Sequence, residues 1–142
     1  MTSAFERLCG PGKPLKREPP DAREIAGLRR SALARLDDAG KSGLALDSRF
    51  DLAYGAAHAL CAAALRSHGY RAAKRYIVFQ LVPHTLELGP EIWRVLARCH
   101  DMRNLAEYEG EMRVTETLVD ELIVICRVLA RKLDEIRVDA AR

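Results

Sequence analysis

Hydrophobic residues recur at intervals of three and four along most of the chain, which is the spacing of a helix with one buried face. Five segments carry this pattern, separated by glycine, proline or short polar stretches. They are 21–40, 47–69, 71–82, 89–110 and 115–136. Because the joins between them are short, the segments predict an all-α fold, a five-helix up-and-down antiparallel bundle over residues 21–138.

Residues at the ends of these segments predict where the helices begin and stop. Asp21 followed three residues later by Glu24 forms a capping box at the first start. The other predicted starts are Asp47 or Ser48, Pro90 after Gly89, and Thr115. The predicted stops are Gly40, Gly69 and Gly110, with Pro83 interrupting the third segment.

Both ends of the chain fall outside this pattern. Residues 1–20 contain Pro11, Pro14, Pro19 and Pro20 among scattered lysines and arginines, a composition with little to bury. It predicts a flexible arm, and residues 139–142 are expected to form a short tail.

Composition narrows the class of protein further. The chain has 142 residues, of which 49% are hydrophobic and 6% aromatic, as expected for one helical domain. A net charge of +3 permits contact with RNA without implying it. No apolar run approaches the roughly 18 residues of a membrane span, and the four cysteines lie far apart, as in reduced thiols. We therefore expect a cytoplasmic protein that does not contact a membrane.

Motifs of the common enzyme classes are missing: the sequence has no phosphate-binding glycine loop, nucleophile elbow, His-Glu-x-x-His pair or Cys-x-x-Cys pair. His58 and Cys61 on one helix could face Cys99 and His100 on another. Adjacent helical residues point about 100° apart, however, and both cysteines belong to apolar stripes. The sequence predicts neither a metal site nor a cofactor.

Arg103 is the unusual residue of the fourth segment. Steps of four, three and four residues from Ile92 lead through Leu96 and Cys99 to Arg103, which places its guanidinium on the stripe expected to be buried. A buried charge without partners costs several kcal/mol. Arg103 is therefore either paired with a carboxylate or used at a cleft or interface.

Two carboxylates are candidate partners for Arg103. Glu107 follows one helical turn later, at the spacing of a helical ion pair. Asp51 lies at the edge of the second segment's stripe together with Tyr54 and His58. We predict that these four residues line any site built around Arg103.

The sequence Arg-Asn-Leu-Ala-Glu-Tyr at 103–108 ends a late helix, follows the helix Phe-Asp-Leu-Ala-Tyr-Gly-Ala-Ala-His-Ala-Leu at 50–60, and precedes a long closing helix. In this arrangement the chain resembles the HEPN domains of prokaryotes over roughly residues 22–138. The resemblance implies a helical bundle, usually a homodimer, often encoded beside a nucleotidyltransferase-type antitoxin. In members that cleave RNA without a metal, an Arg with a polar follower precedes a His, and two chains bring their motifs together.

By this resemblance Arg103 is the motif arginine and Asn104 its polar follower, while Tyr108 stands near the position of the histidine. No histidine follows Arg103, and a phenol with an ordinary pKa near 10 is a poor base at neutral pH. A HEPN subgroup with an Arg-x-x-Ala-(Asp or Glu)-Tyr pattern is more similar. Whether the chain is an enzyme stays open.

Two other groups of residues were weighed as sites. Arg94 and His100 have a motif-like spacing but point about 120° apart on one helix, which favours surface neighbours. Arg71, Lys74 and Arg75 form a basic cluster that is either a solvated face or a rim contacting phosphate.

Two functions remain open from the sequence. The first is a HEPN-like protein of a toxin–antitoxin or nucleotidyltransferase-associated module, which binds RNA or a nucleotide in a dimeric cleft lined by Arg103, Asn104 and Tyr108. The second is a non-catalytic helical scaffold, in which the same residues hold a buried polar network and the function is to bind a protein partner or a nucleotide.

Overall fold

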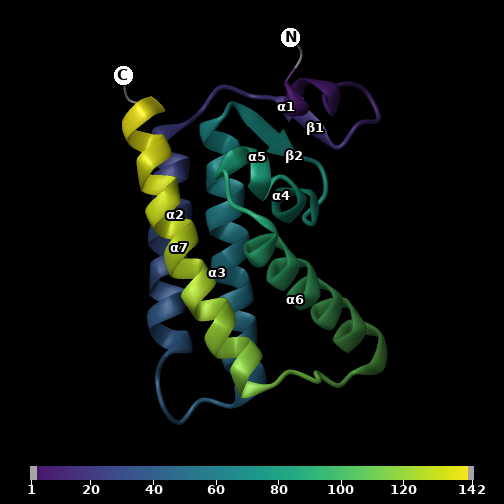
Figure 1. Cartoon of the computed structure of the whole chain (residues 1–142), viewed down its shortest axis with the longest axis vertical. Helices are drawn as coiled ribbons and strands as arrows, with labels where there is room; N and C mark the ends of the chain where they lie inside the picture. Colours follow the sequence, from purple (N-terminus) through teal and green to yellow (C-terminus); the bar gives the residue numbers. More distant parts are fainter. Residues whose placement is uncertain (1–2, 141–142) are drawn as a thin grey trace.

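The computed structural model describes residues 3–140 of the chain, with side chains described up to residue 136, and the fold is mainly helical. Four long helices run alternately down and up the molecule, and both termini lie at the same end (Figure 1). They are α2 (Ala22–Ala39), α3 (Leu46–Ser67), α6 (Pro90–Glu109) and α7 (Glu116–Ala140). The shorter elements are α1 (Ala4–Arg7), β1 (Leu15–Arg17), β2 (Tyr70–Ala72), α4 (Ile77–Gln80) and α5 (Val82–Thr85).

Helix α3 is the centre of the bundle, with α2 and α7 packed along it. Its buried positions go most of the way round the helix, a pattern typical of a helix enclosed by others. Many of them are alanines no more than 5% exposed: Ala53, Ala56, Ala57, Ala59, Ala63 and Ala64. Such small side chains let neighbouring helices approach closely. Helix α6 instead diverges from the other three, so that its end lies away from the bundle (Figure 1).

Most of the predicted helix ends are confirmed. The Asp21 carboxylate accepts hydrogen bonds from the backbone of Arg23 and Glu24, and the Thr115 hydroxyl accepts one from Leu118 N at 3.1 Å. Gly110 ends α6 with a φ of 71°, a left-handed conformation that favours glycine. The start of α3 differs from the prediction. Ala45 is its N-cap, and Asp47 lies inside the first turn, where its charge favours the helix dipole.

The predicted helix at 71–82 is wrong. Tyr70–Ala72 form strand β2, which pairs antiparallel with β1 in the register Leu15↔Ala72 and Arg17↔Tyr70. Bends and turns follow at 73–76, and the single-turn helices α4 and α5 come after them. Pro83 lies in the first turn of α5, where its missing N–H costs nothing, so it begins a helix instead of ending one.

Residues 3–20 also differ from the flexible arm that their composition predicts, because they pack on the bundle. Leu15 is 1% exposed and Cys9 is 8% exposed. The Phe5 ring lies 5.0 Å from that of Tyr70 and 5.1 Å from that of His68. The buried side chains of this segment and the pairing of β1 with β2 therefore hold it against the bundle despite its four prolines. At the other end α7 continues through Ala140, and positions 141–142 of the predicted tail lie outside the described residues.

The four cysteines are all unbridged and buried. Burial raises the pKa of the Cys99 thiol to about 12, so it is protonated at neutral pH. In the part of the chain that the structure describes, no helix has the length and apolar character needed to cross a membrane.

We expect Leu15→Ala to lower the free energy of unfolding by about 2–4 kcal/mol, because it removes a fully buried side chain from the join between β1 and the bundle. Urea unfolding measures this change. Lys16→Ala is the matched control, since Lys16 is exposed on the same strand. A loss below about 0.5 kcal/mol for Leu15→Ala would mean that this segment unfolds separately from the bundle.

Candidate functional site

Arg103 lies where α6 leaves α3, at the edge of the bundle. Its guanidinium carbon is 5.2 Å from the centre of the Tyr54 ring, in a cation–π contact, and its side chain is 31% exposed. The first part of the α6 stripe is buried as predicted, at Ile92, Leu96 and Cys99. Because the end of α6 diverges from the bundle, the same face of the helix is partly exposed at Arg103. The guanidinium is therefore half-buried, not buried as the stripe predicted.

Both predicted carboxylates face Arg103 at a distance. Asp51 Oδ1 is 3.9 Å from Nη1, and Glu107 Oε1 is 3.9 Å from Nε. Charge-assisted hydrogen bonds have lengths of about 2.7–2.9 Å, so neither contact is a hydrogen bond. The two carboxylates exceed the single positive charge of Arg103, but neither accepts a hydrogen bond from it, so its N–H donors stay available to another acceptor.

His100 lies at the centre of the polar contacts beside Arg103. Its Nδ1 is 3.0 Å from the Tyr54 hydroxyl, its Nε2 is 3.0 Å from Asn104 Nδ2, and its ring stacks on Tyr76 with centroids 4.0 Å apart. An amide nitrogen can only donate, so Nε2 accepts and Nδ1 carries the ring proton. Nδ1 then donates to Tyr54, whose own hydroxyl hydrogen stays available for a ligand.

The pKa shifts of His100 and Tyr54 indicate that both rings are uncharged at neutral pH, beside the cation of Arg103. Burial lowers the pKa of His100, although the charges of Asp101 and Glu107 act in the opposite direction. Burial likewise raises the pKa of the Tyr54 hydroxyl, opposed by the charges of Arg103 and Arg75. At neutral pH His100 is therefore uncharged and Tyr54 is protonated.

Two predicted site residues do not join this cluster. Tyr108 is 92% exposed; five residues beyond Arg103, it points about 140° away around the helix. His58 lies against Phe79, with ring centroids 5.9 Å apart, and Phe79 in turn contacts Tyr54 at 5.6 Å. Phe79 thus separates His58 from the Arg103 surface, by which we mean Asp51, Tyr54, His100, Arg103, Asn104 and Glu107.

His100 is the site residue that the sequence interpretation missed. The sequence argues against a site shared by His100 and Arg94, six residues earlier, and favours two surface neighbours. The spacing of three to Arg103 and four to Asn104 puts His100 on their face of α6, and this was the signal that could have found it.

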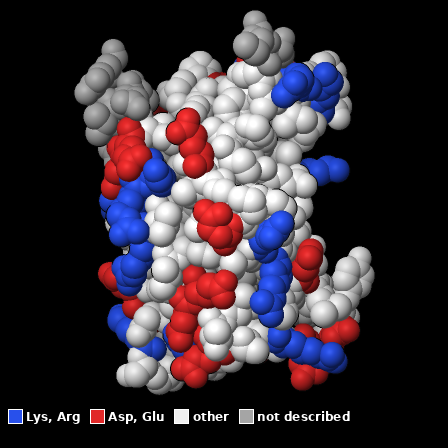
Figure 2. Space-filling model, in the orientation of Figure 1, with Lys and Arg blue, Asp and Glu red and all other residues white. Residues whose placement is uncertain are grey.

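No protein family, curated protein or solved structure matches the chain. Within the described residues, no group of three or more His, Cys, Asp or Glu side chains is arranged to hold a metal ion. In the view of Figure 2, acidic and basic side chains alternate over the surface without a large area of one sign. The Arg103 surface is therefore interpreted from its own chemistry: one cation on an aromatic ring, one available hydroxyl and one amide.

His58 makes the stability of the fold depend on pH. Burial first, and then the charge of Arg75, lower its pKa to about 4, although a hydrogen bond to the Arg75 backbone opposes both. In the unfolded chain the pKa is near 6.5, so the unfolded state binds more protons between about pH 6.5 and 4. The stabilisation is complete above this window and is lost as the pH falls through it.

Between pH 7 and pH 4.5 we expect the wild-type protein to lose about 2 kcal/mol more unfolding free energy than His58→Gln loses. Urea unfolding of both proteins at each pH measures the difference, with the pH 7 value of each protein as its own reference. Equal losses in the two proteins would show that His58 is protonated in the folded state.

Proposed function

We propose that the chain is a HEPN-like protein that binds RNA or a nucleotide, within a toxin–antitoxin or nucleotidyltransferase-associated module. Support comes from four long helices of alternating direction, with the Arg103-Asn104 pair near the end of the third of them. Its partners are then a second copy of the chain and a nucleotidyltransferase-type antitoxin.

The observation that carries this proposal is that the Arg103 guanidinium is held in place while its N–H donors stay available. It is fixed by the Tyr54 ring, and its nearest carboxylate contacts are 3.9 Å long. A planar guanidinium with available donors suits the two oxygens of a phosphate. The exposed part of its side chain gives a phosphate access, and the Tyr54 hydroxyl and Asn104 stand beside it as further contacts.

Binding without efficient cleavage is the version that the cluster favours. A catalytic base needs an available lone pair within reach of the substrate, and both nitrogens of His100 are engaged, by Tyr54 and Asn104. Tyr108 points away from Arg103 and has a phenol in place of an imidazole. The Arg103 surface therefore offers contacts to phosphate and lacks an imidazole with a lone pair available to accept a proton.

A scaffold that binds a protein partner is the second candidate, and one observation favours it. Leu105 is 44% exposed and Tyr108 is 92% exposed, both on the last turns of α6. Exposed apolar side chains beside a charged surface are typical of an interface. A second copy of the chain would cover them equally well, which is what the HEPN resemblance implies.

Replacing Arg103 tests RNA binding. We expect Arg103→Ala to weaken binding of a short single-stranded RNA at least about tenfold, and Arg103→Lys to weaken it as well, because lysine cannot make the bidentate contact. Fluorescence anisotropy at one fixed salt concentration measures the affinity. Arg94→Ala is the control, since Arg94 is an exposed arginine of the same helix and its loss changes the net charge equally. Equal weakening by Arg94→Ala would show that RNA binding depends on the net charge of the protein and not on Arg103 itself.

Light scattering tests the dimer. At tens of micromolar we expect about twice the mass of one chain, and we expect Tyr108→Glu to give monomers because it places a charge in the isologous contact. Val124→Glu is the control, since Val124 is another exposed apolar residue, 62% exposed on α7. A monomeric wild-type protein would contradict the dimeric cleft.

A further inference from the structure

A cavity of about 230 Å³ lies between α2, α3 and the segment from β2 to α4. Its apolar lining comes from Leu28, Ala62, Leu65 and Val78. For comparison, an apolar cavity of roughly 150 Å³ holds benzene. The space therefore suits a molecule with one ring and one or two substituents.

The charges around this cavity leave an excess of positive charge at its rim. Arg66 and Arg71, which both line it, are neutralised by Glu24 and Glu18 through contacts of 2.5–2.7 Å. Lys74 and Arg75 line the same cavity and are exposed.

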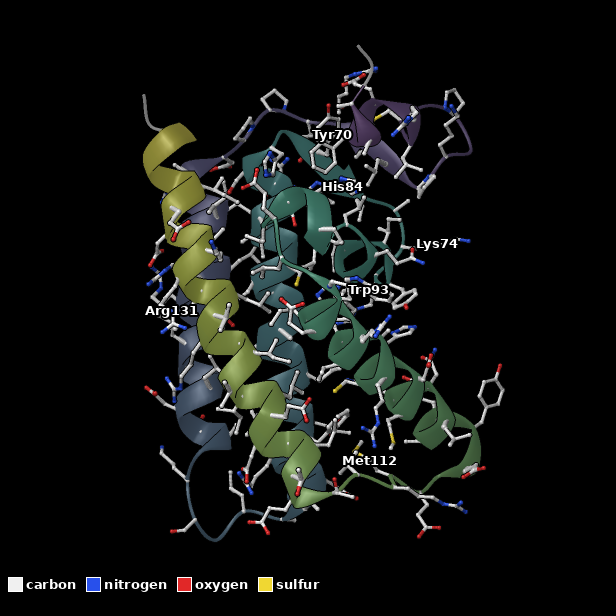
Figure 3. All side chains as sticks on the ribbon, in the orientation of Figure 1. Tyr70, Lys74, His84, Trp93, Met112 and Arg131 are labelled. Carbon is white, nitrogen blue, oxygen red and sulfur yellow. The ribbon has the colours of Figure 1, made fainter. Side chains whose placement is uncertain are left out.

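Among the side chains that the structure describes, no carboxylate forms an ion pair with Lys74 or Arg75. Figure 3 shows the Lys74 side chain projecting from the edge of the molecule. The rim therefore offers two cations to an anion.

His58 also lines the cavity. Its Nε2 has no hydrogen-bond partner among the described residues, but the atom is fully buried, so a ligand in the cavity does not reach it. The contacts offered to a ligand are therefore the apolar side chains and the two cations at the rim.

We propose that this cavity binds a single-ring aromatic carboxylate. The ring lies among the apolar side chains, and the carboxylate meets Lys74 and Arg75. This proposal does not depend on RNA binding, because it uses none of the residues of the Arg103 surface.

Two probes separate these contributions. 4-Hydroxybenzoate has the ring and the charge, and 4-hydroxybenzamide lacks the charge. By calorimetry on the full chain we expect 4-hydroxybenzoate to bind at least about tenfold more tightly than 4-hydroxybenzamide. Uridine monophosphate is the third probe, and tighter binding of this nucleotide would overturn the assignment to an aromatic carboxylate.

Two variants test whether binding occurs in this cavity. The double variant Lys74→Gln with Arg75→Gln removes the rim charge and should weaken 4-hydroxybenzoate about tenfold while leaving 4-hydroxybenzamide unchanged. Ala62→Phe should abolish binding by filling the space. Arg94→Gln is the control, since Arg94 is exposed and lies outside the cavity lining.

Absence of 4-hydroxybenzoate binding up to about 10 mM would overturn the proposal, as would equal affinity for the acid and the amide. Affinity unchanged by the rim double variant would also overturn it. The last result is decisive even if Ala62→Phe does not fold, because both rim residues are exposed.

Discussion

The burial of one guanidinium constrains the whole upper end of the molecule. Arg66, near the end of α3, is 4% exposed and donates hydrogen bonds to Glu24 Oε1 at 2.5 Å and to the carbonyls of Pro19, Glu18 and Tyr70 at 2.7, 2.8 and 3.3 Å. A buried charge without such partners costs several kcal/mol. The segment before α2 must therefore return across the end of α3, and this return brings β1 beside β2.

The central position of α3 determines the rest of the arrangement. Because α2 and α7 occupy two of its sides, the segment between β2 and α6 packs against what remains. Phe79 of α4 fills that space, in contact with Tyr54 and His58 of α3 and with His100 of α6. This one ring contacts Tyr54 and His100 of the Arg103 surface and also His58, which lines the cavity. Both sites thus depend on the same aromatic framework.

Sequence patterns predicted those features that local chemistry decides. The stripes of α2, α3, α6 and α7 and the caps at Asp21 and Thr115 depend on neighbouring residues, so spacing alone revealed them. The strand β2 depends on a partner more than fifty residues away in sequence. The packing of residues 3–20 depends on β2 and Tyr70 and, at Glu18 and Pro19, on Arg66. The position of His100 depends on Tyr54 across the helix contact. No local pattern contains these distant partners.

The Arg103 surface and the rim of the cavity select ligands by different physics. At Arg103 an anion competes with Asp51 and Glu107, each 3.9 Å away. Coulomb attraction at that distance near a surface is already substantial, so a competing anion gains mainly from shorter, directional hydrogen bonds. Lys74 and Arg75 have no such carboxylates to displace among the described side chains, and there the charge of the ligand decides. Geometry therefore governs binding at the Arg103 surface, whereas charge and ring size govern it at the cavity.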